Sequence, residues 1–199
     1  MSEAGIAYVG LGANLGAREQ ALAGAVQALA DTPGLRLSGL SSCWSSAPVD
    51  AEGPDFVNAV ARLDCALAPL ALLDRLQALE AAAGRRRPYR HAPRTLDLDL
   101  IDMPGHPLQH PRLQLPHPRA AARLFVLLPL LELWPDAAWP AWGRAEACAR
   151  RLAAAQRLQR LPADARWQAL QARCEKPHDQ PSFQRPLSCK PPSSDEEPR

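Results

Sequence analysis

The chain has 199 residues and a formal net charge of +2, which suits one domain with a hydrophobic core and argues against a protein that coats nucleic acid. Five scattered cysteines form no Cys-x-x-Cys pair, so the sequence indicates neither a disulfide framework nor a zinc site. It shows no signal-peptide pattern and no apolar stretch long enough to cross a membrane, so we expect a cytoplasmic protein without a membrane partner.

The first half of the chain predicts an α+β fold. Short apolar or alternating segments predict strands, and the alanine- and leucine-rich segments between them predict helices. Pro69 suits the first turn of the second helix and Gly84 its end. In chain order the predicted elements are a strand at 5–11, a helix ending near Ala30, strands at 35–45 and 56–65, a helix at 69–83 and a strand at 94–100. The order β-α-β-β-α-β is that of ferredoxin-like antiparallel sheets, with the helices packed on the sheet in α/β/α layers.

The second half of the chain predicts loops followed by C-terminal helices. Residues 102–118 are rich in proline and are expected to be mostly loop. Helices are expected at residues 119–134, with an interruption at Pro129, and at residues 144–161. Beyond Glu175 frequent proline and few apolar residues predict disorder. The predicted division of the chain is a main domain at 1–162, a helical extension at 163–174 and a proline-rich tail at 175–199.

Residues 94–100, Arg-Thr-Leu-Asp-Leu-Asp-Leu, carry the strongest functional signal. Because side chains alternate along a strand, Asp97 and Asp99 share one face at a separation of roughly 6–7 Å, and the leucines face a core. Two such carboxylates repel each other, and Mg²⁺ held together with phosphate oxygens relieves that repulsion. The arginines that precede the pair and could bind phosphate are Arg85, Arg86, Arg87, Arg90 and Arg94. The pattern favours a nucleotide site over a solvated edge strand, which stays open on these residues alone.

Residues 84–100 resemble the signature of the 6-hydroxymethyl-7,8-dihydropterin pyrophosphokinase family of folate biosynthesis. Three further segments agree in order and spacing: Gly-Leu-Gly-Ala-Asn-Leu-Gly at 10–16, Pro-Asp-Phe-Val-Asn-Ala-Val at 54–60 and Leu-Pro-His-Pro-Arg at 115–119. The resemblance implies transfer of the β,γ-pyrophosphoryl unit of ATP to the hydroxymethyl oxygen of the pterin, with release of AMP. It implies two Mg²⁺ ions as cofactors, ATP as co-substrate, and ATP and the hydroxymethyldihydropterin as small-molecule partners, and we expect a monomer that binds no nucleic acid.

The resemblance also implies roles for individual residues. Asp97 and Asp99 match metal ligands, and Arg85 and Arg94 match catalytic arginines. The positions that match pterin-binding residues are Ser46, Pro48, Val49, Phe56, Asn58 and Phe125. The positions that match ATP-binding residues are Gln77, Glu80, Arg87, Leu100, Arg112, His117 and Arg123. His110 matches no functional position and is expected to lie on the surface.

Three alternatives stay open on the sequence. An RNA-binding module shares the element order, although Asp97 and Asp99 would repel its phosphates unless metal is present. The stretch from Gly84 to Arg94 is about one residue shorter than in some members of the family, and the loop before Phe56 is also shortened, which keeps open a paralogue that binds pterin or nucleotide without turnover. A different metal-dependent phosphotransferase would release ADP in place of AMP. The chain is too short to add a second folate-pathway enzyme, so we expect a single activity.

Overall fold

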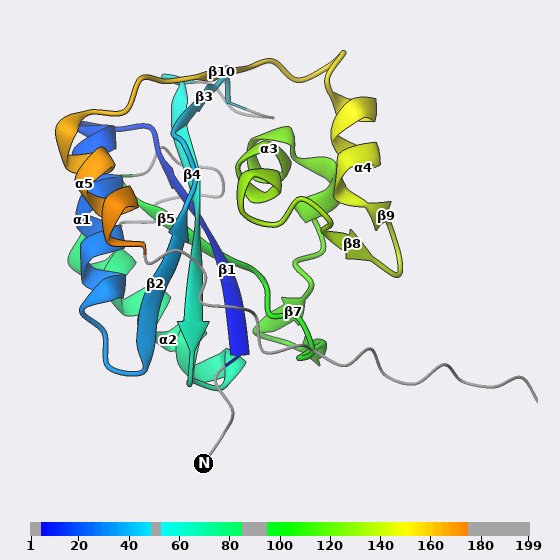
Figure 1. Cartoon of the computed structure of the whole chain (residues 1–199), viewed down its shortest axis with the longest axis horizontal. Helices are drawn as coiled ribbons and strands as arrows, with labels where there is room; N and C mark the ends of the chain where they lie inside the picture. The colour runs from blue at the N-terminus through cyan, green and yellow to red at the C-terminus, as the bar shows by residue number, and fades with distance from the viewer. Residues whose placement is uncertain (1–4, 49–52, 85–94, 175–199) are drawn as a thin grey trace, which may run out of the picture.

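The computed structural model describes residues 5–48, 53–84 and 95–174. Its centre is a six-stranded antiparallel sheet in the order β10-β3-β4-β1-β5, and β2 pairs with the same edge of β4 as β3 (Figure 1). The strands are β1 (Gly5–Ala13), β2 (Leu35–Leu40), β3 (Trp44–Ser46), β4 (Phe56–Cys65), β5 (Asp97–Asp102) and β10 (Leu158–Arg160). The predicted antiparallel sheet of an α+β fold is confirmed.

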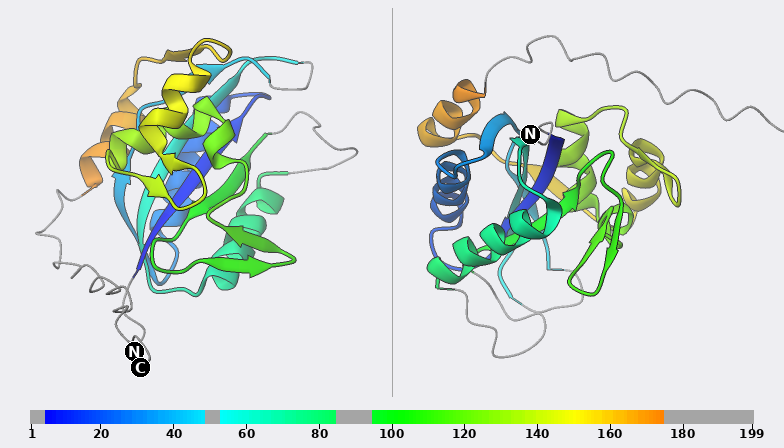
Figure 2. Two further views of the ribbon diagram at one scale, coloured as in Figure 1. Left: turned by 90° about the vertical axis from the view of Figure 1, so that its right-hand side faces the viewer. Right: turned by 90° about the horizontal axis from the view of Figure 1, so that it is seen from below.

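Helices cover both faces of the sheet, as Figures 1 and 2 show. The alternation of side chains along the strands supplies a core on each face: Val9 and Leu63 lie in the first core, whereas Tyr8 and Val60 lie in the second. The predicted α/β/α layers are therefore confirmed. The helices on the first core are α1 (Arg18–Ala30), α2 (Pro69–Ala82) and α5 (Ala165–Arg173), and those on the second core are α3 (Leu124–Leu133) and α4 (Ala145–Leu152).

The single strand expected at residues 35–45 is two strands, β2 and β3, joined by residues 41–43. β2 pairs with the C-terminal half of β4, and β3 pairs with its N-terminal half. At the junction the backbone N–H of Val60 donates to the hydroxyl of Ser41 at 2.9 Å. A side-chain oxygen thus takes the place of a carbonyl of the ladder, and this local substitution ends one strand before the next begins.

The segment at residues 102–118, expected to be mostly loop, contains a hairpin of β6 (Leu108–His110) and β7 (Leu113–Leu115). A second short hairpin, β8 (Ala138–Trp139) and β9 (Gly143–Arg144), leads into α4. Strands of two or three residues are too short to show an alternating pattern in the sequence. Neither hairpin was therefore predicted from the sequence.

The helix expected at residues 119–134 begins as a 3₁₀ turn, η1 (Ala120–Ala122), and continues as α3. Pro129 lies inside α3 and is buried, so the interruption expected there is wrong. Proline removes one N–H donor from the helix, but α3 packs against β4, and we attribute the continuity of the helix to this packing.

The helix expected at residues 144–161 is correct only for its first part, because α4 ends at Leu152. Residues 158–160 form β10, which pairs with β3. The backbone N–H of Leu161 also donates to the carbonyl of Cys43 at 2.8 Å. Pairing with a strand far earlier in the chain overrides the local helical preference of this segment.

α5 lies within the helical extension predicted at residues 163–174. Asp164 caps the helix, because its carboxylate accepts from the backbone N–H of Trp167 at 2.7 Å. The side chains of Trp167 and Leu170 are buried in the first core, so α5 packs on the sheet beside α1. The domain boundary at residue 162 stays a prediction. Among the described residues no helix is both long and apolar enough to span a membrane.

Candidate active site

The two aspartates lie on β5, which forms one edge of the sheet. Asp97 and Asp99 are half-buried, and their neighbours Leu96, Leu98 and Leu100 are only 2%, 4% and 2% exposed in the first core. Because successive side chains point to opposite faces, both carboxylates face the layer that holds α3. The shared face predicted for the two aspartates is confirmed.

β1 lies between the strand of the two aspartates and the strand of Asn58, and it carries two glycines there. Gly10 lies opposite Asp99, and Gly12 lies between Asp97 on β5 and Asn58 on β4. A Cβ atom at Gly12 would lie 3.5 Å from Oδ1 of Asn58 and 4.0 Å from Cβ of Asp97. The missing side chain leaves room over the face of β1, between the side chains of Asn58 and Asp97, for a ligand to approach the backbone. No functional role for Gly12 was predicted, and its only signal in the sequence is its place in the Gly-Leu-Gly segment.

Asn58 is held in one orientation on β4. Its Nδ2 donates to the hydroxyl of Ser46 at 3.0 Å and to the carbonyl of Trp44 at 3.4 Å. Ser46 and Asn58 are only 6% and 5% exposed. Both amide protons are therefore directed toward β3, and Oδ1 is left as the acceptor that faces the space beside Gly12. Phe56 and Pro48, also expected at the pterin, are half-buried in the same part of the chain.

Arg123 and Phe125 approach the aspartates from the start of α3. Nη1 of Arg123 lies 3.6 Å from Oδ2 of Asp99. The guanidinium carbon of Arg123 also lies 5.5 Å from the ring centroid of Phe125, within the range of a cation–π contact. The structure thus joins a predicted ATP residue, a predicted pterin residue and a predicted metal ligand in one contiguous group.

His117 lies beside the same carboxylate and is held by backbone hydrogen bonds. The backbone N–H of His117 donates to the carbonyl of Ile101 at 2.8 Å, and the ring Nδ1 accepts from the backbone N–H of Arg119 at 3.2 Å. Burial is the main cause that lowers the pKa of His117; Asp99 opposes this shift, and Arg123 and Arg119 reinforce it. The neutral ring is favoured at pH 7, and its proton resides on Nε2 because Nδ1 is an acceptor. His117 can therefore donate a hydrogen bond without carrying charge.

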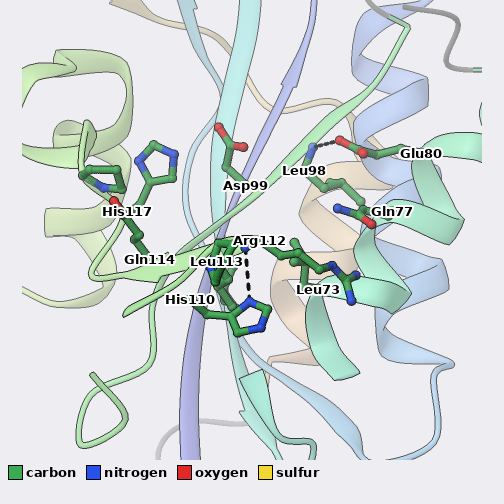
Figure 3. Close-up of a pocket in the computed structure, with 13 residues that line it drawn as sticks. Leu73, Gln77, Glu80, Leu98, Asp99, His110, Arg112, Leu113, Gln114 and His117 are labelled. Carbon is green, nitrogen blue, oxygen red and sulfur yellow. Dashed lines mark hydrogen bonds between the residues drawn. The ribbon is translucent and has the colours of Figure 1, made fainter. Parts of the chain in front are cut away.

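A cavity of about 340 Å³ opens beside β5, at the edge of the sheet (Figure 3). α2, β5 and the β6–β7 hairpin form its walls, and Asp99 lies on its boundary. Figure 3 shows Gln77 and Glu80 on one side of this space and His117 on the other. The predicted ATP residues that line it are Gln77, Glu80, Leu100, Arg112 and His117. The structure thus brings together five residues that the resemblance assigned to ATP.

Glu80 and Arg112 have structural partners that the sequence did not indicate. Glu80 is only 3% exposed, and its Oε1 accepts from the backbone N–H of Leu98 at 2.7 Å, between the two aspartates. Arg112 forms an exposed ion pair with Asp74 on α2. Glu80 therefore fixes β5 against α2, and Arg112 is held at the rim of the cavity.

His110 is a cavity residue that the sequence analysis placed on the surface. It lines the cavity, and its Nδ1 accepts from the backbone N–H of Arg112 at 3.1 Å (Figure 3). Its position depends on the β6–β7 hairpin, which was itself missed, so no signal in the sequence pointed to it. Val49, Arg85, Arg87 and Arg94 lie outside the described residues, and their roles stay predictions.

Comparison with known proteins identifies the family of the chain. The family model described as 7,8-dihydro-6-hydroxymethylpterin-pyrophosphokinase (HPPK) matches residues 8–135. A 2-amino-4-hydroxy-6-hydroxymethyldihydropteridine pyrophosphokinase of Pseudomonas aeruginosa is 46% identical over 134 residues, which are 67% of this chain and 83% of the relative. The protein of the same name from Methylorubrum extorquens is 42% identical over 131 residues, 65% of this chain and 83% of the relative.

The solved structures agree on the fold. A crystal structure described as HPPK-DHPS in complex with substrates aligns with a TM-score of 0.63 at 11% sequence identity, over 77% of this chain. The aligned part is 44% of that protein, so the chain spans less than half of its length. With the sequence matches above, these findings show that the chain belongs to the 7,8-dihydro-6-hydroxymethylpterin-pyrophosphokinase (HPPK) family and is a transferase of the diphosphokinase class.

Proposed function

We propose that the protein transfers the pyrophosphoryl unit of ATP to 6-hydroxymethyl-7,8-dihydropterin in a Mg²⁺-dependent reaction that releases AMP. The observation that carries this proposal is the position of the aspartate pair. Asp99 borders the cavity formed by α2, β5 and the β6–β7 hairpin. Asp97 lies across Gly12 from Asn58. The pair thus lies between a cavity suited to the nucleotide and a set of residues suited to the pterin.

The aspartate pair fits Mg²⁺ because this ion is usually held by one or two carboxylates together with phosphate oxygens and water. In the described ranges no three His, Cys, Asp or Glu side chains are grouped as a complete metal cage. Such a cage is not needed where substrate oxygens supply the other ligands. The Asp99 side chain is 43% exposed and is thus accessible to a ligand. Bound there, two Mg²⁺ ions would neutralise charge on the phosphates and orient the attacking hydroxyl.

On the ATP side, we assign the adenosine and phosphates to the cavity at the edge of β5. Gln77 offers both a donor and an acceptor to a base or ribose, and His117 donates from Nε2 as a neutral group. Arg123 can neutralise phosphate oxygens near Asp99, because its guanidinium stays charged and forms paired hydrogen bonds. Arg85 and Arg94 keep their proposed catalytic role, and the remaining proposed ATP contacts are Glu80, Arg87, Leu100 and Arg112.

On the pterin side, Asn58 presents its Oδ1 as a fixed acceptor. A pterin ring carries N–H donors on the edge of its pyrimidine half, and this edge complements the acceptor. Phe56 on β4 and Phe125 on α3 offer aromatic faces for the flat ring. Ser46, Pro48 and Val49 complete the proposed pterin-binding set. We further propose that the enzyme works as a monomer on small molecules in the cytoplasm.

Product analysis tests the proposed function. The protein is incubated with ATP, Mg²⁺ and the pterin, beside a reaction without pterin, and the nucleotides are separated by chromatography. Asp97→Asn removes one carboxylate of the pair, and Asp136→Asn is the matched control because Asp136 lies in an exposed pair with Arg144. We expect pterin-dependent AMP from the wild type and from Asp136→Asn, with a loss of at least about a hundredfold in Asp97→Asn. ADP as the product, or no turnover by folded protein, would refute the proposal; the second result would favour a binding paralogue.

A further inference from the structure

Gln156 brackets the backbone on both sides of Arg123. Its Oε1 accepts from the backbone N–H of Leu124 at 2.8 Å, and its Nε2 donates to the carbonyl of Ala122 at 3.0 Å. One side-chain amide therefore holds the residue before Arg123 and the residue after it. Gln156 lies beyond residues 8–135, the part of the chain that the family model matches.

The side chain of Gln156 satisfies a backbone N–H group at the start of α3. The first N–H groups of a helix have no partner within the helix, and a short polar side chain at the N-cap usually accepts from one of them. The N-cap of α3 is Arg123, whose side chain has no acceptor and makes no cap hydrogen bond. Leu124 follows it and is only 3% exposed, so little water is available to its N–H. Gln156 supplies the acceptor from another segment.

This arrangement leaves the Arg123 side chain to the active site. Gln156 satisfies the N–H of Leu124, the first helical residue, and the N–H of Val126 donates to the backbone carbonyl of Arg123 at 3.0 Å. The N-cap position can therefore carry a long cation in place of a Ser, Thr or Asp. The guanidinium then lies 3.6 Å from Asp99 and over the ring of Phe125. The direction of the Arg123 side chain depends on its own backbone, and Gln156 fixes that backbone at both neighbouring peptides.

The short segment that carries Gln156 is held by hydrogen bonds at both of its ends. Its backbone N–H donates to the carbonyl of Leu152, the last residue of α4, at 2.9 Å. Two residues later the chain enters β10, where Leu158 lies opposite Ser46. The segment between α4 and β10 is thus fixed at one end to α4, in the second core, and at the other end to β3, the strand that pairs with β4 at Asn58. A side chain on such a segment is suited to positioning another residue.

We propose that Gln156 is a positioning residue that orients Arg123 toward the phosphates of ATP. The proposal rests on the function proposed above for the Arg123 side chain. It predicts that Gln156 affects the reaction only through Arg123. A residue that merely stabilised the fold would lower activity whether or not Arg123 is present.

Gln156→Met tests the bracket, because methionine has a similar length but offers neither the amide donor nor the amide acceptor. The matched control is Gln159→Met on β10, where the side chain is exposed and the backbone forms the pairing with β3. Hydrogen exchange measured by mass spectrometry on peptides spanning residues 120–127 should accelerate in Gln156→Met and not in Gln159→Met. This readout needs no catalysis, so it remains valid if the proposed function fails. Unchanged exchange would overturn the proposal.

A double-mutant cycle with Arg123→Ala separates positioning from general stability. With Arg123 present, Gln156→Met should lower kcat/KM for ATP roughly tenfold, because a displaced catalytic group can cost up to about a hundredfold. In the Arg123→Ala background it should lower kcat/KM no further. An unchanged kcat/KM in the single variant, or an equal loss in both backgrounds, would overturn the proposal. If the wild type shows no turnover, the same cycle is measured on the affinity for an unreactive ATP analogue.

Discussion

Replacing Ser46 with alanine tests how the pterin side of the site holds its acceptor. The Ser46 hydroxyl accepts from Nδ2 of Asn58 at 3.0 Å, and both residues are about 5% exposed. Without it, among the residues that the structure describes, the amide keeps only the longer contact to the Trp44 carbonyl, at 3.4 Å. Leaving a buried donor this poorly satisfied costs about 1 to 1.5 kcal/mol. If the whole cost falls on the orientation of Oδ1, pterin affinity drops by up to roughly tenfold.

The assay is a fluorescence titration of the protein with 6-hydroxymethyl-7,8-dihydropterin in the presence of Mg²⁺ and an unreactive ATP analogue. Ser45→Ala is the matched control, because Ser45 is adjacent on β3 and its side chain points to the other face of the sheet. Ser46→Ala should weaken pterin binding and leave the affinity for the ATP analogue unchanged, since Ser46 does not line the cavity. Equal pterin affinities of Ser46→Ala and the wild type would refute the reasoning about Asn58.

Burial raises the pKa of the Asp102 carboxyl in the folded protein above its value in the unfolded chain. The folded protein therefore favours the protonated carboxyl, and the free energy of unfolding falls as pH rises through the raised pKa. Asp102→Asn keeps an acceptor for Nε1 of Trp139 but cannot titrate. The free energy of unfolding, measured with urea between pH 4 and 8, should therefore fall less steeply with pH in Asp102→Asn than in the wild type, and an equal slope in the two proteins would contradict this prediction. Glu80→Ala should destabilise the fold by about 1 to 3 kcal/mol in the same assay because the Leu98 N–H loses an acceptor, whereas the exposed Arg75→Ala should not. Removal of Mg²⁺ with EDTA should abolish AMP formation, and added Mg²⁺ should restore it; turnover that persists in EDTA would exclude the metal-dependent reaction.

The elements that the sequence predicted well are those with a local pattern. β1, α1, β4, α2 and β5 each carry an apolar period or a clear end signal, such as Pro69 at the start of α2. The bounds of β5 differ, because the strand expected at 94–100 runs from Asp97 to Asp102. Long-range pairing decided the others. β10 is a strand only because β3 lies beside it, and β2 ends where the Ser41 hydroxyl replaces a ladder carbonyl. No local pattern in the sequence predicts the formation of β10 or the end of β2.

The candidate site divides in the same way. The alternation of Asp97 and Asp99 with buried leucines is a property of a single strand, so the shared face could be derived from the sequence. The grouping of Gln77 with His117 around one cavity agrees with a resemblance, but no spacing in the chain predicts it. His110, the buried carboxylate of Glu80 and the bracket made by Gln156 depend on contacts between distant segments, and they became visible only in three dimensions.

The most direct test of the account is the fate of the β-phosphorus of ATP. The protein is incubated with the pterin, Mg²⁺ and ATP labelled at the β-phosphorus, and the labelled products are separated. Transfer of a pyrophosphoryl unit predicts that the label leaves the nucleotide and is recovered in the pterin product, while ATP labelled at the α-phosphorus gives labelled AMP. Retention of the β label in ADP, with only the γ-phosphorus on the pterin, would contradict pyrophosphoryl transfer at the aspartate pair.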